Sequence, residues 1–452
     1  MNQSILALII SLCLFIIYAS IYHTKQLFIS IAFFTPLSIN IEEYIDGFGL
    51  YLPTEPILFG LLLIFIFFQI QKPLSNTKTL KHPIIVGSLA YLFIIFLTSI
   101  TSSSPIVSFK FLLSKLWFVI PLLFLGTSIF KDKKAIRLFL FLFVLSVFIT
   151  VVYTLIIHAS YNFGEEEGHW VMWPFFKDHT IYGAIIAIAL PIAIGLLCSK
   201  EHSLIIKAFY IILISIILVG LYFSYTRAAW LSVVIALFIL AFIHYKVKFK
   251  YLVGLGVISL FIVFFSWDKI MMEMQRNKYE HTTEEFGERI QSAANVSSDA
   301  SNLERLNRWE CAIEMFKERP VFGFGPGTYS FEYARYQRPE NLTIISTNFG
   351  NKGNAHSEYL SALSESGIFG LLSLLGFITA IFYSSIKLYF KTNNKEDKFI
   401  TLSIILAFST YFFHGILNNY LDTDKASVPI WGMCAIIIAL QNNLLLKKEI
   451  ND

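Results

Sequence analysis

The sequence has little charge and few cysteines for its length. Only 15% of its 452 residues are charged, whereas 56% are hydrophobic and 45 are phenylalanine. This balance excludes a disordered chain and a soluble protein, because a soluble core could not bury so many apolar residues in one chain. Of the four cysteines, Cys311 alone lies in a long polar segment. We therefore expect neither a disulfide framework nor a zinc site.

Several motifs that define other protein classes are also missing. The sequence contains no GxxxxGK[ST] loop, which argues against an ATP-driven pump, and no HExxH metal site. It has no cytoplasmic basic patch interleaved with aromatic residues, so we expect no nucleic-acid partner. The GFGPG at 323–327 resembles a phosphate-binding loop only superficially, because it follows no strand. We predict that the protein uses no cofactor and no metal.

Long apolar runs recur from end to end of the chain, and most have the ~20 residues that a membrane-crossing helix needs. They are continuous rather than alternating, which predicts helices and not the strands of a membrane barrel. They fall at roughly 4–22, 26–39, 55–71, 83–100, 107–129, 135–157, 180–198, 204–224, 228–245, 249–267, 366–390, 398–417 and 428–447.

The sequence thus predicts an all-α polytopic membrane protein with about 12–13 transmembrane helices. The segment 26–39 is short and contains Pro36, which leaves its crossing and the side of the N-terminus open. The first run lacks a basic leader and a small-residue cleavage site, so we expect it to be a retained span.

Loop charges alternate along the chain and predict its orientation. Basic loops lie at 72–82, 131–137, 244–250 and 391–398, and at the tail with Lys447 and Lys448. The loops between them are acidic or neutral and lie at 40–54, 159–178 and 418–427. The positive-inside rule places the basic set in the cytoplasm and the long segment 268–357 outside. We therefore expect an N-terminal bundle at 1–267, an external, helix-containing loop domain at 268–357 and C-terminal helices at 358–452.

Arg227 lies in a short turn between two apolar runs at the predicted outer boundary. It has two interpretations: an arginine that snorkels and stabilises the turn, or a fixed cation whose planar fork binds a lipid-linked phosphate. Arg305 and Arg308 share a helix face. An amphipathic surface helix explains them equally well, with an apolar side formed by Leu303, Leu306, Ile313 and Phe316. For Lys110 and Lys115, in the outer half of a span, snorkelling is the simpler explanation.

His356 begins the return of the long segment into the membrane. A single histidine there is commonly a polar cap, but a neutral imidazole, with a pKa near ~6.5 if unperturbed, is also the natural general base near pH 7. Glu358 is close enough in sequence to orient it or to bind a sugar hydroxyl. His179 and His414 border spans on the same predicted side.

Three stretches resemble the O-antigen ligase and polymerase superfamily of bacterial envelopes. They are SYTRAAWLSVVIAL, RLNRWECAIEMFKERPVFGFGPGTY and HSEYLSALSESGIFGLL, and they follow the family's order across roughly 180–390. The chain departs from the family pattern in having Tyr225 and Thr226 before Arg227, where serine commonly precedes, and Ser357 after His356, where asparagine commonly follows.

The resemblance implies a membrane glycosyltransferase in the bacterial inner membrane, with its active site facing the periplasm. Such enzymes transfer a saccharide from an undecaprenyl-diphosphate carrier to lipid A–core in lipopolysaccharide biosynthesis, or to another glycan or protein acceptor, without metal or ATP. The resemblance also implies that His356 activates the acceptor hydroxyl. It implies further that Arg227 and Arg305, with Arg308 beside them, bind the diphosphate. Glu358, His179 and Lys115 are possible supporting residues.

Within this superfamily we favour a ligase, while a polysaccharide polymerase and a protein O-oligosaccharyltransferase remain alternatives that differ in the acceptor. A transporter or flippase is the alternative from another class. Transporters usually carry broken helices in paired halves and charges at the membrane midplane. Here the charges gather at the outer boundary and in one long loop, which favours an enzyme.

Overall fold

The computed structural model describes residues 18–43, 49–71, 77–247, 300–338 and 353–451. Within these residues the protein is a helical bundle, and nine helices are long and apolar enough to cross a membrane. The strands β1, Ile39–Asn40, and β2, Tyr51–Leu52, form one short antiparallel pair. The predicted all-α polytopic membrane fold is confirmed.

The long helices follow the predicted apolar runs, but the helix Glu358–Lys391 begins ahead of the run predicted at 366–390, and the short helix Thr77–Leu80 lies in the predicted loop 72–82. The helices are α3 (Thr54–Gln71), α4 (Thr77–Leu80), α5 (Pro83–Ile100), α6 (Pro105–Ile120), α7 (Gly126–Ile129), α8 (Lys133–Ser160), α9 (His179–Ser199), α10 (Leu204–Tyr222), α11 (Arg227–His244), α16 (Glu358–Lys391), α17 (Lys395–His414) and α18 (Asp424–Asn451). A π-helical turn, η2 (Pro121–Leu125), joins α6 to α7. The predicted run 249–267 and most of the first run lie outside the described residues.

The short segment with Pro36 forms α2, Thr24–Leu37, of 14 residues. At ~1.5 Å per residue it is about 21 Å long, less than the ~30 Å of a hydrocarbon core. Its last carbonyls are satisfied by the buried Nζ of Lys425, which donates to the Thr35 oxygen at 2.8 Å and to the Ser38 oxygen at 2.7 Å. The start of α18 thus closes the end of α2.

The centre of the bundle is α9, of whose span 83% is buried, while α10 and α11 face outward. Close approach to α9 depends on small residues, as is typical of helix packing in membranes. A Cβ at Gly195 would lie 2.4 Å from the Ser403 Cβ of α17, and one at Gly183 would lie 2.7 Å from the Thr226 Cβ before α11. These glycines bring α9, α11 and α17 together.

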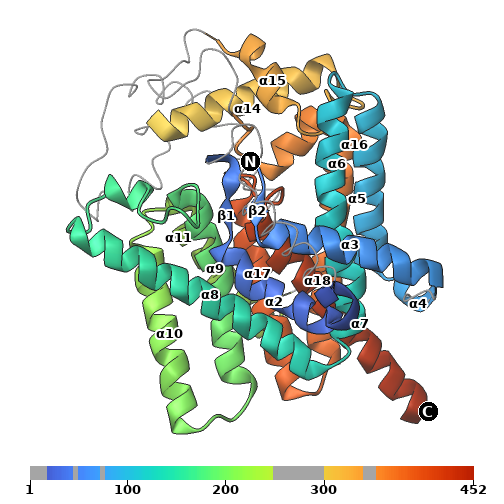
Figure 1. The fold of residues 1–452 in the computed structure, drawn as a ribbon, viewed down its shortest axis with the longest axis vertical. Coiled ribbons are helices and arrows are strands. Elements are labelled where there is room, and N and C mark those ends of the chain that lie inside the picture. The colour runs from blue at the N-terminus through green and yellow to red at the C-terminus, as the bar shows by residue number, and fades with distance from the viewer. Residues whose placement is uncertain (1–17, 44–48, 72–76, 248–299, 339–352, 452) are drawn as a thin grey trace, which may run out of the picture.

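The helices α5, α6 and α16 stand side by side, and α14 (Ala300–Glu318) and α15 (Tyr329–Glu332) lie across one end of the bundle (Figure 1). We call this the α14 end. A short 3-10 helix, η4 (Tyr333–Tyr336), follows α15. The division into 1–267, 268–357 and 358–452 stays a prediction, because 268–299 and 339–352 lie outside the described residues.

The buried face of α14 differs from the predicted one. Leu306 is buried as expected, but Ile313 and Phe316 are partly exposed, and the position of the Leu303 side chain is outside the described set. The residues that pack with Phe324, Tyr329 and Tyr333 are instead Cys311, Ala312 and Met315. The choice of face was wrong because three small or polarisable residues, and not the bulky ones, meet the rings of α15 and η4.

The helix α16 is broken at Gly367, whose φ of 65° and ψ of −162° are not helical. The GFGPG loop packs its backbone against this break. The Phe324 N–H donates to the Ser364 oxygen at 3.2 Å, and the Gly325 N–H donates to the Glu365 oxygen at 2.7 Å. The loop therefore satisfies carbonyls that the interrupted helix leaves open.

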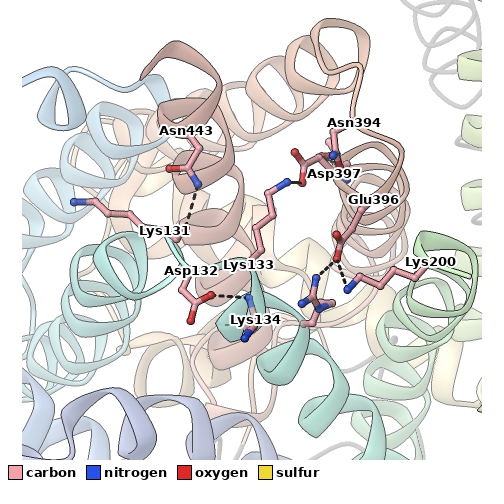
Figure 2. A network of polar contacts seen from close by, with 11 residues as sticks. Lys131, Asp132, Lys133, Lys134, Lys200, Asn394, Glu396, Asp397 and Asn443 are labelled. Carbon is pink, nitrogen blue, oxygen red and sulfur yellow. Dashed lines mark hydrogen bonds and ion pairs between the residues drawn. The ribbon is translucent and has the colours of Figure 1, made fainter. Parts of the chain in front are cut away.

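At the opposite end, α8 and α17 begin beside each other and form a network of ion pairs (Figure 2). Lys133 pairs with Asp397 at 2.5 Å, Arg137 pairs with Glu396, and Lys200 lies 3.9 Å from the same carboxylate. The basic loop at 131–137 is thus matched by the two acidic residues in the first turn of α17.

Candidate functional site

Three long helices begin close together at the α14 end. Asp178 caps α9, since its Oδ1 accepts the N–H groups of Thr180 at 2.9 Å and Ile181 at 3.1 Å. Thr226, just before α11, donates its hydroxyl to the His179 oxygen at 2.7 Å. The Glu358 N–H, at the start of α16, donates to the Gly415 oxygen at 2.8 Å, just beyond the end of α17.

The loop after α17 closes this arrangement, because the Tyr420 hydroxyl is hydrogen-bonded to Thr180 of α9. Asp178 takes the first N–H groups of α9, and Ser357 accepts the Leu360 N–H of α16, whereas Thr226 makes no side-chain cap at α11. The positive end of α11 is therefore the terminus suited to an anionic ligand.

His356 lies directly before Ser357, the N-cap of α16. Its backbone has a φ of 46°, a left-handed conformation that residues other than glycine adopt rarely. Two contacts maintain it: the His356 N–H donates to Asn354 Oδ1 at 3.0 Å, and the Trp309 indole donates to the His356 oxygen at 3.4 Å. Such conformations cluster at functional sites.

Burial and positive charge both act on the His356 ring. Burial lowers its pKa from the ordinary 6.5 to about 4, and the nearby charges of Arg305 and Arg308 contribute, while a hydrogen bond to Asn418 and the charge of Asp178 oppose them. The pKa near ~6.5 was expected for an unperturbed histidine, and His356 is perturbed by surroundings that the sequence did not show. The imidazole is neutral at pH 7 and can accept a proton.

The two arginines of α14 have different surroundings. Arg308 is buried, with its Nε 2.8 Å from Glu304 Oε1 and its Nη1 3.3 Å from the Asn354 oxygen. Its guanidinium also lies 4.9 Å from the centre of the Tyr333 ring. Arg308 thus ties α14 to the segment that carries His356.

Arg305, one turn earlier on the same helix, is partly exposed. It is close enough to His356 and His414 for its charge to act on both rings. Arg227 is the first residue of α11 and is also partly exposed. The predicted arginines therefore lie on two elements that both reach the α14 end.

Glu358 and Lys115 hold the loop between α17 and α18. Glu358 Oε1 accepts hydrogen bonds from the Tyr411 hydroxyl at 2.6 Å and from the N–H groups of Tyr420 and Leu421, both at 2.8 Å. Lys115 Nζ lies 2.5 Å from Asp422 and donates to the Leu421 oxygen at 2.9 Å.

The side chain of Lys115 is only 1% exposed, so the prediction that it snorkels to the surface was wrong. It turns inward because a carboxylate and a carbonyl are available there. Lys110, five residues earlier, is exposed as predicted.

His179 stacks on the ring of His169, with 4.2 Å between the ring centroids. Among the predicted residues, the structure thus brings His356, Arg305 and Arg308 together. It places Glu358 and Lys115 on the adjoining loop and His179 at the start of α9.

Sequence reasoning missed Asn418. Its side chain is buried, and its Nδ2 lies 3.1 Å from His414 Nε2. The signal was the polar stretch LNNYLDT directly after an apolar run, of which only the acidic residues were considered. In the described part of the chain, no three His, Cys, Asp or Glu side chains are grouped as metal ligands would be.

Comparison with known proteins agrees with this geometry. The sequence model of the family described as O-antigen ligase matches residues 209–375, which include α11, α14 and the return at His356. A Haemophilus influenzae protein named only as uncharacterized is 24% identical over an alignment of 389 residues, and the alignment covers 82% of this chain and 89% of that protein. The family match over residues 209–375 confirms the resemblance of this part of the chain to the O-antigen ligase superfamily.

Proposed function

We propose that the protein is a glycosyltransferase that moves a saccharide from an undecaprenyl-diphosphate carrier to an acceptor hydroxyl. The site faces the outer side of the bacterial inner membrane. The observation that carries the proposal is the partly buried His356, kept neutral at pH 7 beside the charges of Arg305 and Arg308. A base and a set of cations side by side are what transfer from a diphosphate requires.

In the proposed reaction, a ring nitrogen of His356 takes the proton of the acceptor hydroxyl. The acceptor oxygen then forms a bond to the anomeric carbon as the bond from that carbon to the phosphate oxygen breaks. The electron pair leaves with the carrier diphosphate, whose growing negative charge is stabilised by Arg227, Arg305 and the N-terminus of α11. Direct displacement of this kind inverts the anomeric configuration.

The role of Arg308 differs from that of Arg305 in this proposal. Its guanidinium is engaged by Glu304 and by the Asn354 oxygen, so it positions the His356 segment and adds to the positive field. Glu358 and Lys115 keep the loop at 415–423 in place. They act through the loop and not on the sugar.

The acceptor decides between the members of the superfamily. We favour lipid A–core, and thus a ligase; a growing glycan or a protein hydroxyl would use the same base and the same cations. A transporter fits less well, because the charges of the site lie at helix ends and on α14, outside the middle of the bundle.

Reconstitution in liposomes tests the proposal. Purified protein receives undecaprenyl-diphosphate glycan and each acceptor in turn, without ATP and with a chelator, and transfer is followed by mass spectrometry. Arg227→Lys keeps the charge but loses the bidentate fork, so we expect a fall in transfer of at least about tenfold with unchanged membrane insertion. The matched control is Arg335→Lys, at a half-exposed surface pair with Glu332.

Near-normal transfer by Arg227→Lys would favour an arginine that only stabilises the turn. Absence of transfer to every acceptor by the wild-type protein would contradict the proposed function itself.

A further inference from the structure

Asn418 lies close to both His356 and His414. Its Nδ2 lies 3.1 Å from His414 Nε2, and its side chain is near enough to the His356 ring to raise the pKa of that ring as a hydrogen-bond partner, against the larger effect of burial. Both His414 and Asn418 are 1% exposed. An asparagine amide has one accepting oxygen and two donating hydrogens, so it can serve two imidazoles at once in a fixed order.

The order follows from the chemistry of neutral imidazoles. When Asn418 Nδ2 donates to His414 Nε2, the amide oxygen is left to accept a hydrogen bond from an N–H of His356. The other ring nitrogen of His356 then has the free electron pair. A partner that fixes the tautomer of a histidine in this way commonly determines which nitrogen can act as a base.

The backbone around Asn418 is held independently of this hydrogen bond. The loop at 415–423 is fixed to the start of α16 by the Glu358 N–H on the Gly415 oxygen at 2.8 Å, and by Glu358 Oε1 on two loop N–H groups. Lys115 holds the Leu421 oxygen from α6. Because Glu358 is two residues from His356, the same turn of chain carries the imidazole and anchors the loop that supplies Asn418.

We infer that Asn418 is a positioning residue that sets the tautomer and orientation of His356, with His414 fixing the orientation of the Asn418 amide. This inference deepens the proposed function and rests on it for its catalytic consequence. The effect of Asn418 on the proton affinity of His356 can be measured without any transfer reaction, so this part of the inference is tested independently.

The test uses the full-length protein in detergent, with the variants Asn418→Asp and Asn418→Ala. Exchange of the imidazole carbon-bound hydrogen for deuterium, followed by mass spectrometry across a pH series, gives the titration of His356 itself. A carboxylate in place of the amide stabilises the imidazolium, so in Asn418→Asp we expect the midpoint to lie about one to three pH units higher. The control is Asn419→Ala, whose Oδ1 has no hydrogen-bond partner among the described residues.

The same variants are then assayed for transfer. Loss of a partner that orients a functional histidine commonly costs about 10–100-fold, so Asn418→Ala should lower kcat by that factor with donor binding unchanged. In Asn418→Asp the acid limb of the pH–rate profile should move upward together with the His356 midpoint.

An unchanged His356 midpoint in Asn418→Asp would overturn the inference. Loss of donor binding in Asn418→Ala, with normal thermal stability, would also overturn it and make Asn418 a ligand-binding residue. If the midpoint moves but His356→Ala transfers at the normal rate, the coupling stands and the proposed base is wrong.

Discussion

The imidazole of His356 is partly shielded from water and lies near two positive charges, which decides how activity depends on pH. Since its pKa is lowered to about 4, we predict that kcat/KM of the wild-type protein is flat from pH 7 to about 5 and falls below about 4, where the ring becomes protonated.

The His356→Ala variant tests the role of the ring itself. General-base catalysis contributes about 10²–10⁴-fold, so this variant should lose that factor in kcat while donor binding survives.

The lowered pKa of His356 also makes the folded protein less stable in acid. The unfolded chain takes up a proton on this histidine near pH ~6.5, whereas the folded protein resists protonation until about pH 4. Folding stability therefore falls as the pH drops through this window. An acid limb of the wild-type rate near pH 6.5 would contradict the prediction; an unchanged pH profile in an active His356→Ala variant would make His179 the next candidate.

At the residue scale, the sequence predicted the kind of side chain but not its surroundings. His356 and Arg305 could be found from their place beside apolar runs and from the family resemblance. The inward turn of Lys115 and the position of Asn418 could not, because both depend on a loop some three hundred residues from Lys115 and some sixty from His356. Long-range partners of this kind leave no periodic pattern.

At the scale of single elements, the break in α16 depends on Gly367, which no other residue type could replace without strain. Gly367 has a φ of 65°, and a Cβ there would lie 2.3 Å from the Val321 oxygen. We predict that Gly367→Ala destabilises the protein by at least about 1 kcal/mol, from the left-handed backbone alone, as measured by thermal unfolding in detergent.

The same helix supplies the control for this substitution. A Cβ at Gly376 meets nothing within 4 Å, so Gly376→Ala should be neutral or stabilising by roughly 0.5–1 kcal/mol. Equal effects of the two substitutions would mean that the break in α16 is not maintained by Gly367.

The helix α6 offers a second matched pair. Lys115→Met removes the partner of the Leu421 oxygen and of Asp422, so we expect a loss of about 1–3 kcal/mol in unfolding free energy. Lys110→Met, at an exposed position on the same helix, should change it by less than about 0.5 kcal/mol. A neutral Lys115→Met would show that the loop keeps its place without this contact.

Helix positions could be predicted because a long apolar run needs no partner to be recognised. The run predicted at 83–100 is the helix Pro83–Ile100, and that predicted at 180–198 is His179–Ser199. The break inside α16 could not be predicted, because SESGIFGLL reads as an uninterrupted start of a span. Only the backbone of the GFGPG loop, some forty residues earlier, makes the interruption favourable.

For the molecule as a whole, the alternation of loop charge predicts which end faces which compartment. After Cys198→Ser removes the thiol that is exposed among the described residues, and Cys13 is also changed to serine, a cysteine at Glu165 should react with a membrane-impermeant reagent in cells whose inner membrane is intact. A cysteine at Lys395, beside the ion pairs of Figure 2, should react only after that membrane is permeabilised. The opposite pattern would reverse the predicted orientation and place the site in the cytoplasm.

The break in α16 also bears on how the protein is made. The loop that closes the break, at 320–325, is synthesised before the helix it completes, and it donates to carbonyls that lipid cannot satisfy. The residues from Ile368 onward can enter the bilayer as an ordinary span, but the turn before Gly367 needs the loop already folded beside it. This end of the bundle therefore folds in a fixed order, because the loop at 320–325 must be in place before the first turns of α16 can form.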